Sequence, residues 1–213
     1  MPSIQEIILL LPILLFSLSI HEFSHGFMSY KLGDPTPKVN GRLTLNPLAH
    51  LDLIGSLVLI ITRRIGWAKP VPINPRYYKN PRKGMMYVGF AGPGANIVMA
   101  IILSLIIRVF LIFSNTSLNM VYSGYYSNLT QTIARFFLLA IIINLSLAVF
   151  NLIPVPPLDG SKILRGFLPP RFDKYFYKLE GPLGMVVLLI LAYTGILWKI
   201  ISPVVNLFLN ILI

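Results

Sequence analysis

Cysteine is absent from this chain of 213 residues, and other ionisable groups are few, with seven acidic residues and three histidines. The absence of cysteine excludes disulfide bonds and thiolate metal ligands. Charged residues make up only 12% of the sequence, whereas a soluble domain carries about 25%. The composition therefore excludes an ordinary soluble domain, and a catalytic metal site here would need histidine and carboxylate ligands.

Apolar residues make up 55% of the sequence, and the mean hydropathy of the chain is +0.75. Long apolar runs predict membrane spans, because about 20 apolar residues cross a bilayer. The predicted spans are residues 4–30, 85–113 and 134–153, followed by an apolar region from residue 181 that holds one span and has room for a second. The sequence predicts an all-α integral membrane protein, a polytopic helix bundle forming one membrane-embedded domain over residues 1–213.

The net charge of +11 lies in short loops between the apolar runs rather than along one amphipathic face. This distribution indicates contact with anionic lipids, and it argues against nucleic acid as a partner. Residues 63–83 carry seven Lys or Arg residues, and residues 114–132 carry none. Loops rich in Lys and Arg stay on the cytoplasmic side. We therefore expect a multi-pass protein of the plasma membrane, with residues 31–83 and 162–178 inside and residues 114–132 outside.

Residues 48–62 are too short in apolar length for a span, with only a short run of apolar or small residues after His50 and Asp52. A crossing here would also force the basic loop that follows to the outside. The pattern favours a short re-entrant or surface-lying segment. The basic, proline-rich loop that follows predicts an interfacial β-hairpin, with residues 67–73 at its centre.

His21, Glu22 and His25 form an H-E-x-x-H motif in the C-terminal third of the first predicted span. Residues four apart lie on one face of a helix, so both imidazoles can face a single metal ion. Glu22 lies beside them, where a carboxylate that is not a ligand can take a proton from a metal-bound water. The alternative is a pair of interfacial histidines at a helix end. Ionisable clusters at membrane depth are costly and therefore typical of functional sites.

A catalytic zinc site uses three protein ligands, so two histidines are not enough. Asp159 lies in a Pro-Pro-Leu-Asp-Gly stretch at the cytoplasmic end of the third span, at a depth similar to that of His21 and His25. The alternative role for Asp159 is the N-cap of a helix over residues 160–168. His50 and Asp52 are weaker candidates, because His50 is more typical of a local hydrogen-bonding residue.

Three segments together resemble the site-2 protease family of intramembrane zinc metalloproteases: His21-Glu22-Phe23-Ser24-His25, Gly92-Pro93-Gly94-Ala95-Asn96, and residues 151–160 with the pattern Asn-x-x-Pro-x-Pro-x-Leu-Asp-Gly. Their order and apolar context match over nearly the whole chain, which looks like a compact member without a PDZ-like insertion. The resemblance implies His21, His25 and Asp159 as ligands of one zinc ion, Glu22 as the catalytic acid/base, and Asn151 as a residue that contacts substrate or the oxyanion.

The resemblance also implies hydrolysis of peptide bonds in transmembrane or membrane-associated protein substrates, with the active site toward the cytoplasmic side. The alternative for Asn151 is a hydrogen bond between helices. Two other functions remain open. A membrane transporter would show repeated halves or paired discontinuous helices, and neither is visible. A catalytically inactive metal-binding scaffold would keep the helices and lose the chemistry, yet Glu22 and every proposed ligand are present.

Overall fold

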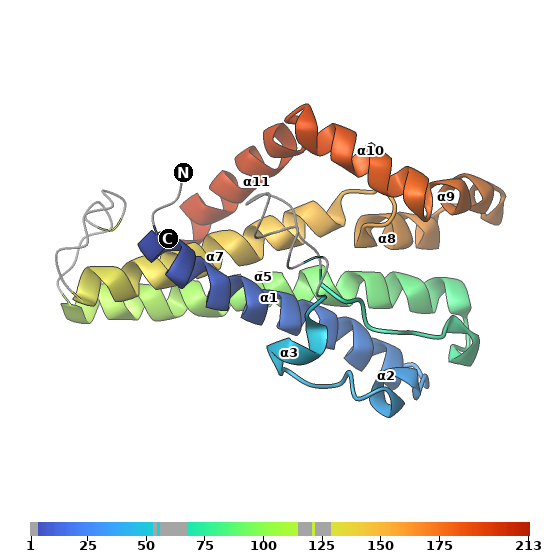
Figure 1. Ribbon diagram of the computed structural model, residues 1–213, viewed down its shortest axis with the longest axis horizontal. Helices are drawn as coiled ribbons and strands as arrows, with labels where there is room; N and C mark the ends of the chain where they lie inside the picture. Colours follow the sequence, from blue (N-terminus) through green and yellow to red (C-terminus); the bar gives the residue numbers. More distant parts are fainter. Residues whose placement is uncertain (1–3, 53–54, 56–67, 115–120, 122–128) are drawn as a thin grey trace.

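The computed structural model describes residues 4–52, 55, 68–114, 121 and 129–213, and the described chain is mostly helical (Figure 1). Its three long helices are α1 (Ile4–Lys31), α5 (Pro81–Ser114) and α7 (Leu129–Leu152). Each is long and apolar enough to cross a membrane. The three predicted spans are therefore confirmed as helices, with ends that differ from the predicted ones by a few residues.

Shorter helices follow the long ones. They are α2 (Thr36–Val39), α3 (Pro47–His50), α8 (Asp159–Phe167), α9 (Asp173–Leu179), α10 (Pro182–Tyr193), α11 (Ile196–Leu212) and the 3-10 turns η1 (Pro75–Tyr77) and η2 (Pro170–Phe172). At the C-terminal end, α10 and α11 meet at Gly195, whose positive φ of 74° breaks the helix. The apolar region from residue 181 thus forms two short helices (Figure 1), and a bend of 73° separates α10 from the helical segment before it.

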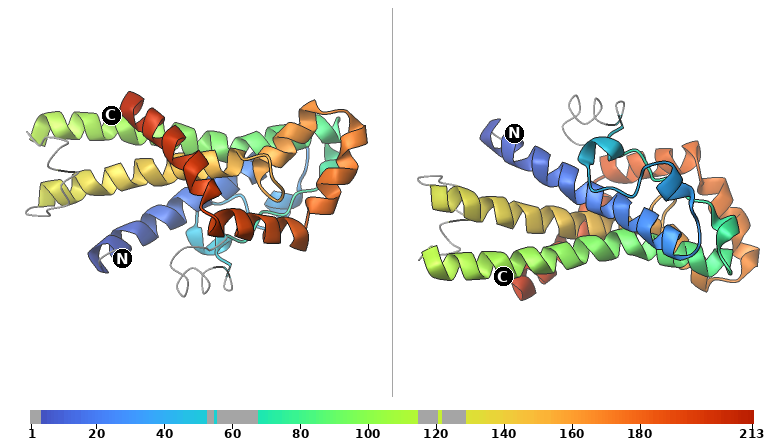
Figure 2. Two further views of the ribbon diagram at one scale, coloured as in Figure 1. Left: turned by 90° about the horizontal axis from the view of Figure 1, so that it is seen from above. Right: turned by 90° about the horizontal axis from the view of Figure 1, so that it is seen from below.

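Helix α5 packs against α7, α1 and α8, while α11 packs on α7. The long helices approach one another most closely toward the end that carries α8, and they diverge toward the other end (Figure 2). Within α7, buried residues recur at steps of three and four: Ala134, Leu138, Ile141, Leu145 and Ala148. This spacing makes one continuous stripe along the helix.

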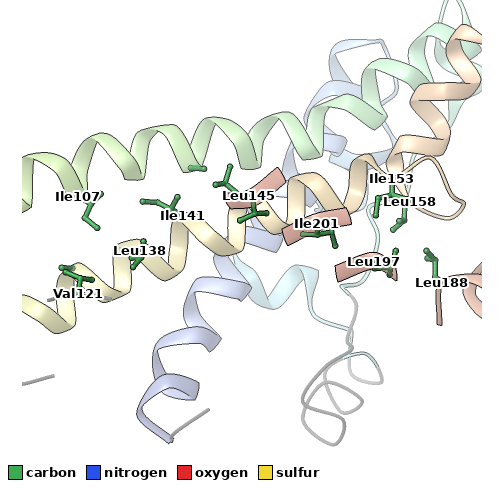
Figure 3. Close-up of a cluster of buried hydrophobic side chains, with 13 residues drawn as sticks. Ile107, Val121, Leu138, Ile141, Leu145, Ile153, Leu158, Leu188, Leu197 and Ile201 are labelled. Carbon is green, nitrogen blue, oxygen red and sulfur yellow. The ribbon is translucent and has the colours of Figure 1, made fainter. Parts of the chain in front are cut away.

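The stripe of α7 packs against side chains of α5 and α11, among them Ile107 and Ile201 (Figure 3). The outer face of α5 carries exposed apolar side chains, including Val98, Leu105 and Ile112. An apolar surface of this kind is stable in lipid, which solvates it as well as a protein core does. The bundle is therefore apolar on both its inner and outer faces, as expected for an integral membrane protein.

The predicted β-hairpin is not confirmed. In the described part of the chain the only β pairing is an isolated antiparallel bridge between Leu51 and Ala68. Pro70 and Pro72 offer a reason, since proline has no N–H to donate to a neighbouring strand. Most of the predicted re-entrant segment at residues 48–62, together with Trp67 of the hairpin, lies outside the described residues, so the re-entrant path stays a prediction.

Candidate metal centre

Three buried side chains from distant parts of the chain meet at one point. His21 and His25 come from α1, and Asp159 is the first residue of α8. The Nε2 atoms of the two histidines lie 3.0 Å apart. Asp159 Oδ2 lies 3.2 Å from His21 Nε2 and 3.0 Å from His25 Nε2. The three atoms thus form a nearly equilateral triangle.

The hydrogen bond at Nδ1 of each imidazole determines whether its Nε2 atom, which faces the triangle, carries a hydrogen or a lone pair. His25 Nδ1 donates to the carbonyl oxygen of Val88 at 2.7 Å, because a carbonyl can only accept. His21 Nδ1 faces Asn96 Oδ1 at 2.6 Å and donates to it. In the neutral rings both Nε2 atoms then carry lone pairs. Two lone pairs and a carboxylate oxygen therefore face one another with no hydrogen between them.

A divalent cation at the centre of the triangle satisfies all three acceptors at once, whereas one proton would serve only a single pair of them. Zinc bonds of about 2.0–2.1 Å in a tetrahedral shell place neighbouring ligand atoms about 3.3–3.4 Å apart. The observed separations of 3.0–3.2 Å are close to these values. Two nitrogens and one carboxylate oxygen are also a donor set that zinc favours, so the residues present fit a catalytic zinc ion.

The first turn of α8 directs the Asp159 side chain toward the two histidines. Leu158, not Asp159, is the N-cap residue, and no side chain caps this helix end. The N-cap role considered for Asp159 is therefore not what the structure shows. Its Oδ1 accepts a hydrogen bond of 2.8 Å from Lys162 Nζ one turn later, which leaves Oδ2 for the triangle. Gly160 lies against the carbonyl oxygens at the end of α7, where a Cβ would collide.

Gly92 allows α5 to pass close to the two histidines. A Cβ built at this position would lie 2.5 Å from His25 Nε2 and 2.7 Å from His21 Cε1. Such distances are essentially never seen for a real Cβ, so a side chain here would displace the imidazoles. Gly94, two residues further along the same helix, has nothing within 4 Å of the equivalent position.

The triangle opens into a cavity of about 170 Å³. Glu22 and Asn151 line it, together with residues of the extended segment 69–74, which we call the strap. The backbone N–H of Val71 in the strap donates to Glu22 Oε2 at 3.0 Å. Asn151 Nδ2 donates to Leu147 O at 2.9 Å, and this hydrogen bond stays within its own helix.

Two buried charged residues hold the strap at its ends. At one end Arg42 donates to the carbonyl oxygens of Lys69 and Pro70 at 2.6 and 3.0 Å. At the other end, fully buried Asp34 accepts from the Asn74 N–H at 2.7 Å. These contacts fix the path of the strap across the cavity.

The surroundings of Asp34 keep it ionised. Burial would raise the pKa of this carboxyl, but hydrogen bonds from Thr36, Asn74 and Ser29 outweigh it, and the pKa lies below its usual value. Burial raises the pKa of Tyr78, whose hydroxyl lies 2.7 Å from Ser29 Oγ, and the Asp34 charge adds to the effect. A negative charge therefore persists at the end of the strap.

The weaker ligand candidates lie elsewhere. His50 Nε2 donates to Thr44 O at 2.8 Å. Asp52 Oδ1 accepts from the backbone N–H of Gly55 at 2.7 Å. Neither belongs to the group of His21, His25 and Asp159 found among the described residues.

Sequence reasoning missed three contributors to the site: Lys162, the Val71 N–H and Asn144, which bonds to Asn96. Lys162 is three residues from Asp159 in a helix, a spacing that places two side chains on one face and signals the contact. Asn144 is one of a few polar residues inside the apolar run of the third span, which also marks it as functional or structural. The backbone donor of Val71 has no sequence signal.

We predict that Gly92→Ala lowers the metal content of the purified protein, because the added methyl displaces both imidazoles. Gly94→Ala is the matched control on the same helix and should bind metal as the parent chain does. Metal analysis of the two proteins, purified in detergent and compared by thermal unfolding, tests this. Full metal content in Gly92→Ala would show that the close approach of α5 does not constrain the site.

Comparison with known proteins gives a consistent result. The family model for peptidase family M50 matches residues 9–193. YwhC of Bacillus subtilis (strain 168), described as a candidate zinc metalloprotease, is 36% identical over 193 residues, which are 91% of this chain and 84% of YwhC. Rip2 of Mycolicibacterium smegmatis, described in the same way, is 32% identical over 83% of this chain and 64% of its own length.

A third relative is the zinc metalloprotease MJ0392 of Methanocaldococcus jannaschii, 29% identical over 92% of this chain and 46% of its own length. No solved structure matches the chain. The family model covers most of the chain, and the residues around the triangle carry the H-E-x-x-H motif in a membrane helix. This chain therefore belongs to peptidase family M50, the site-2 protease family of membrane zinc metallopeptidases.

Proposed function

We propose that this protein is an intramembrane zinc metalloprotease that cleaves transmembrane or membrane-associated proteins, with residues 1–213 as one catalytic domain. The observation that carries the proposal is the convergence of His21, His25 and Asp159 beside Glu22 in one cavity. The relatives named as zinc metalloproteases support it. A single zinc ion per chain matches the single group of ligands found among the described residues.

His21, His25 and Asp159 are the proposed ligands, and the fourth position is left for water or substrate. When bound, zinc supplies Lewis-acid activation of the attacking water and of the scissile carbonyl. Glu22 is not a ligand, and its Oε atoms are free of any salt bridge among the described residues, so its role is to accept a proton and return it to the leaving nitrogen. The Val71 N–H holds this carboxylate toward the cavity.

Asn151 and the strap are the proposed contacts for substrate. Asn151 lines the cavity, and one N–H of its amide is engaged within α7, which leaves the second to donate to a substrate carbonyl or to the oxyanion. A transmembrane substrate has all its backbone groups paired and must unwind before cleavage. The extended strap lines the same cavity. Its prolines and its bonds to Glu22 and Asp34 leave it few N–H groups, and Arg42 binds its carbonyl oxygens as far as Pro70. We therefore propose that the carbonyl oxygens after Pro70 are its edge for an unwound, strand-like segment.

The proposed orientation places the site on the cytoplasmic side of a plasma-membrane protein. Lys and Arg residues cluster at residues 63–83 and 162–178, and none occurs at residues 114–132. This asymmetry supports the orientation by the positive-inside rule. Lys162, the first residue of the second cluster, lines the cavity. Lipid is the proposed environment of the outer apolar face of α5.

We predict that Glu22→Gln keeps its zinc and loses proteolysis, because the amide still accepts from Val71 but cannot take a proton. Loss of general acid/base help lowers the rate by at least about 100-fold. The assay is cleavage of a model transmembrane substrate in detergent, with zinc content measured in parallel. Glu180→Gln, which removes a carboxylate paired with Arg165, is the control. A Glu22→Gln protein as active as the control would refute the mechanism.

Alanine substitutions distinguish Asp159, the proposed third ligand, from the weaker candidates His50 and Asp52. We expect Asp159→Ala to lose most of its zinc, since it leaves only two ligands. His50→Ala and Asp52→Ala should retain zinc, because their side chains bond elsewhere. Chelator competition measures the three affinities. An empty site in Asp52→Ala together with a full one in Asp159→Ala would reassign the third ligand.

The orientation is testable because the chain has no background cysteine. A cysteine introduced at Ser123 should react with a membrane-impermeant thiol reagent in intact cells, and one at Lys79 should react only after lysis. Ser123 lies outside the described residues, so this expectation rests on the charge of the loops. Labelling of intact cells at position 79 and not at 123 would reverse the orientation, and labelling at both would require another crossing.

A further inference from the structure

Behind His21, on the side away from the cavity, two buried asparagines join the three long helices. Asn96 belongs to α5 and Asn144 to α7, and their exposed fractions are 0% and 2%. Asn96 Nδ2 donates to Asn144 Oδ1 at 2.8 Å. Both also bond to Ser17 of α1, one to its carbonyl oxygen and the other to its hydroxyl. We call Asn144 and Asn96 the amide relay.

The orientation of the Asn144 amide follows from a backbone carbonyl. Its Nδ2 lies 2.8 Å from Ala140 O and 2.9 Å from Ser17 Oγ. A carbonyl cannot donate, so the atom facing Ala140 has to be the nitrogen. Both hydrogens of the amide are then used, and the oxygen is left facing Asn96.

The orientation of Asn96 follows in the same way. Its amide lies between Asn144 Oδ1 and Ser17 O, which are both acceptors, so its Nδ2 is on that side and donates to both. A flipped amide would place its oxygen against two other oxygens at buried positions, where unsatisfied polar atoms are costly. Asn96 Oδ1 therefore faces His21, and it can only accept a hydrogen bond.

We propose that the amide relay holds His21 in the tautomer with hydrogen on Nδ1, so that Nε2 presents its lone pair to the metal. This rests on the proposed role of His21 as a ligand. Asn96 and Asn144 are positioning residues in this scheme, because neither reaches the cavity. The carbonyls of Ser17 and Ala140 can only accept, so they fix the orientations of both amides. The 2.6 Å hydrogen bond from His21 Nδ1 to Asn96 Oδ1 is the last bond of this series.

The other two histidines serve as internal references. His25 is held in the same tautomer by the carbonyl of Val88, which no side-chain substitution at the relay removes. His50 donates from Nε2 to Thr44 O and so has the opposite tautomer. With three histidines in the whole chain, the structure predicts two rings with hydrogen on Nδ1 and one with hydrogen on Nε2.

Nitrogen NMR of the full chain, labelled in its imidazole rings and measured without metal at mildly alkaline pH, reads these tautomers directly. The expected pattern in the parent protein is two Nδ1–H rings and one Nε2–H ring. Asn96→Leu should change one Nδ1–H ring into a mixture of tautomers and leave the other two rings as they were. An unchanged His21 ring in Asn96→Leu would overturn the proposal.

Zinc affinity separates positioning from stability. Asn96→Leu should bind zinc about 10- to 100-fold more weakly, the range seen when a residue that orients a metal-ligating histidine is lost. Asn96→Asp keeps an acceptor for His21 but places an oxygen against Asn144 and Ser17. It should therefore unfold at a lower temperature while keeping most of the zinc affinity that Asn96→Leu loses. Affinities that simply follow the unfolding temperatures would overturn the proposal.

Asn144→Leu tests the relay from a position that does not touch His21. We expect weaker zinc binding than in the parent and no additional loss when it is combined with Asn96→Leu, because both act through one contact. Ser104→Ala is the matched control, because Ser104 is a buried polar residue of α5 whose hydroxyl donates to Ile101 O of its own helix, and this variant should bind zinc normally. Additive losses in the double variant would overturn the relay.

The same measurements keep this proposal apart from the proposed function. A parent protein with the predicted tautomers and normal zinc binding that cleaves no peptide would refute the protease function and leave the amide relay intact. Proteolysis that survives in Asn96→Leu at full zinc affinity would leave the protease function intact and refute the relay.

Discussion

The structure depends on a requirement at the metal triangle: three atoms with lone pairs, two imidazole nitrogens and one carboxylate oxygen, have to be held face to face at buried positions, although 138 residues separate His21 from Asp159. Atoms of this kind repel one another unless a cation lies between them. The fold therefore has to hold α1 and α8 in place from outside the triangle. Helix α5 does so, since it packs on both and has no side chain at Gly92 where it passes the histidines.

Two kinds of interaction share the task of holding the helices. Hydrogen bonds between membrane helices contribute on average about 0.6 kcal/mol each, so the few bonds of Asn96, Asn144 and Ser17 supply only a small part of the stability. Close packing of the α7 stripe against α5 and α11 supplies most of it. The hydrogen bonds instead fix the rotation of each helix about its axis. A packed apolar stripe tolerates small rotations of a helix, whereas a network in which every amide hydrogen has a partner allows only one arrangement.

Much of this could be predicted from the sequence, and the exceptions have physical reasons. The spans follow from apolar length, and the facing of His21 and His25 follows from helical spacing. Asp159 could be proposed from its depth and from the family resemblance. The hairpin at residues 67–73 was not confirmed in the described chain, because prolines remove the N–H groups that pair strands. The partner of Asn96 could not be predicted, since it depends on how α5 and α7 cross, and a sequence does not state which faces of two apolar helices meet.

The bond from the Val71 N–H to Glu22 has a consequence for how such a site changes during evolution. Its donor belongs to the backbone, so most substitutions at position 71 leave the N–H in place. What determines the contact is the path of the strap, and that path is fixed by Arg42 and Asp34, both of which lie in the connection after α1. The position of the Glu22 carboxylate therefore depends on Arg42 and Asp34, neither of which contacts it. A substitution of either residue would shift the Glu22 carboxylate while every residue of the site itself stayed unchanged.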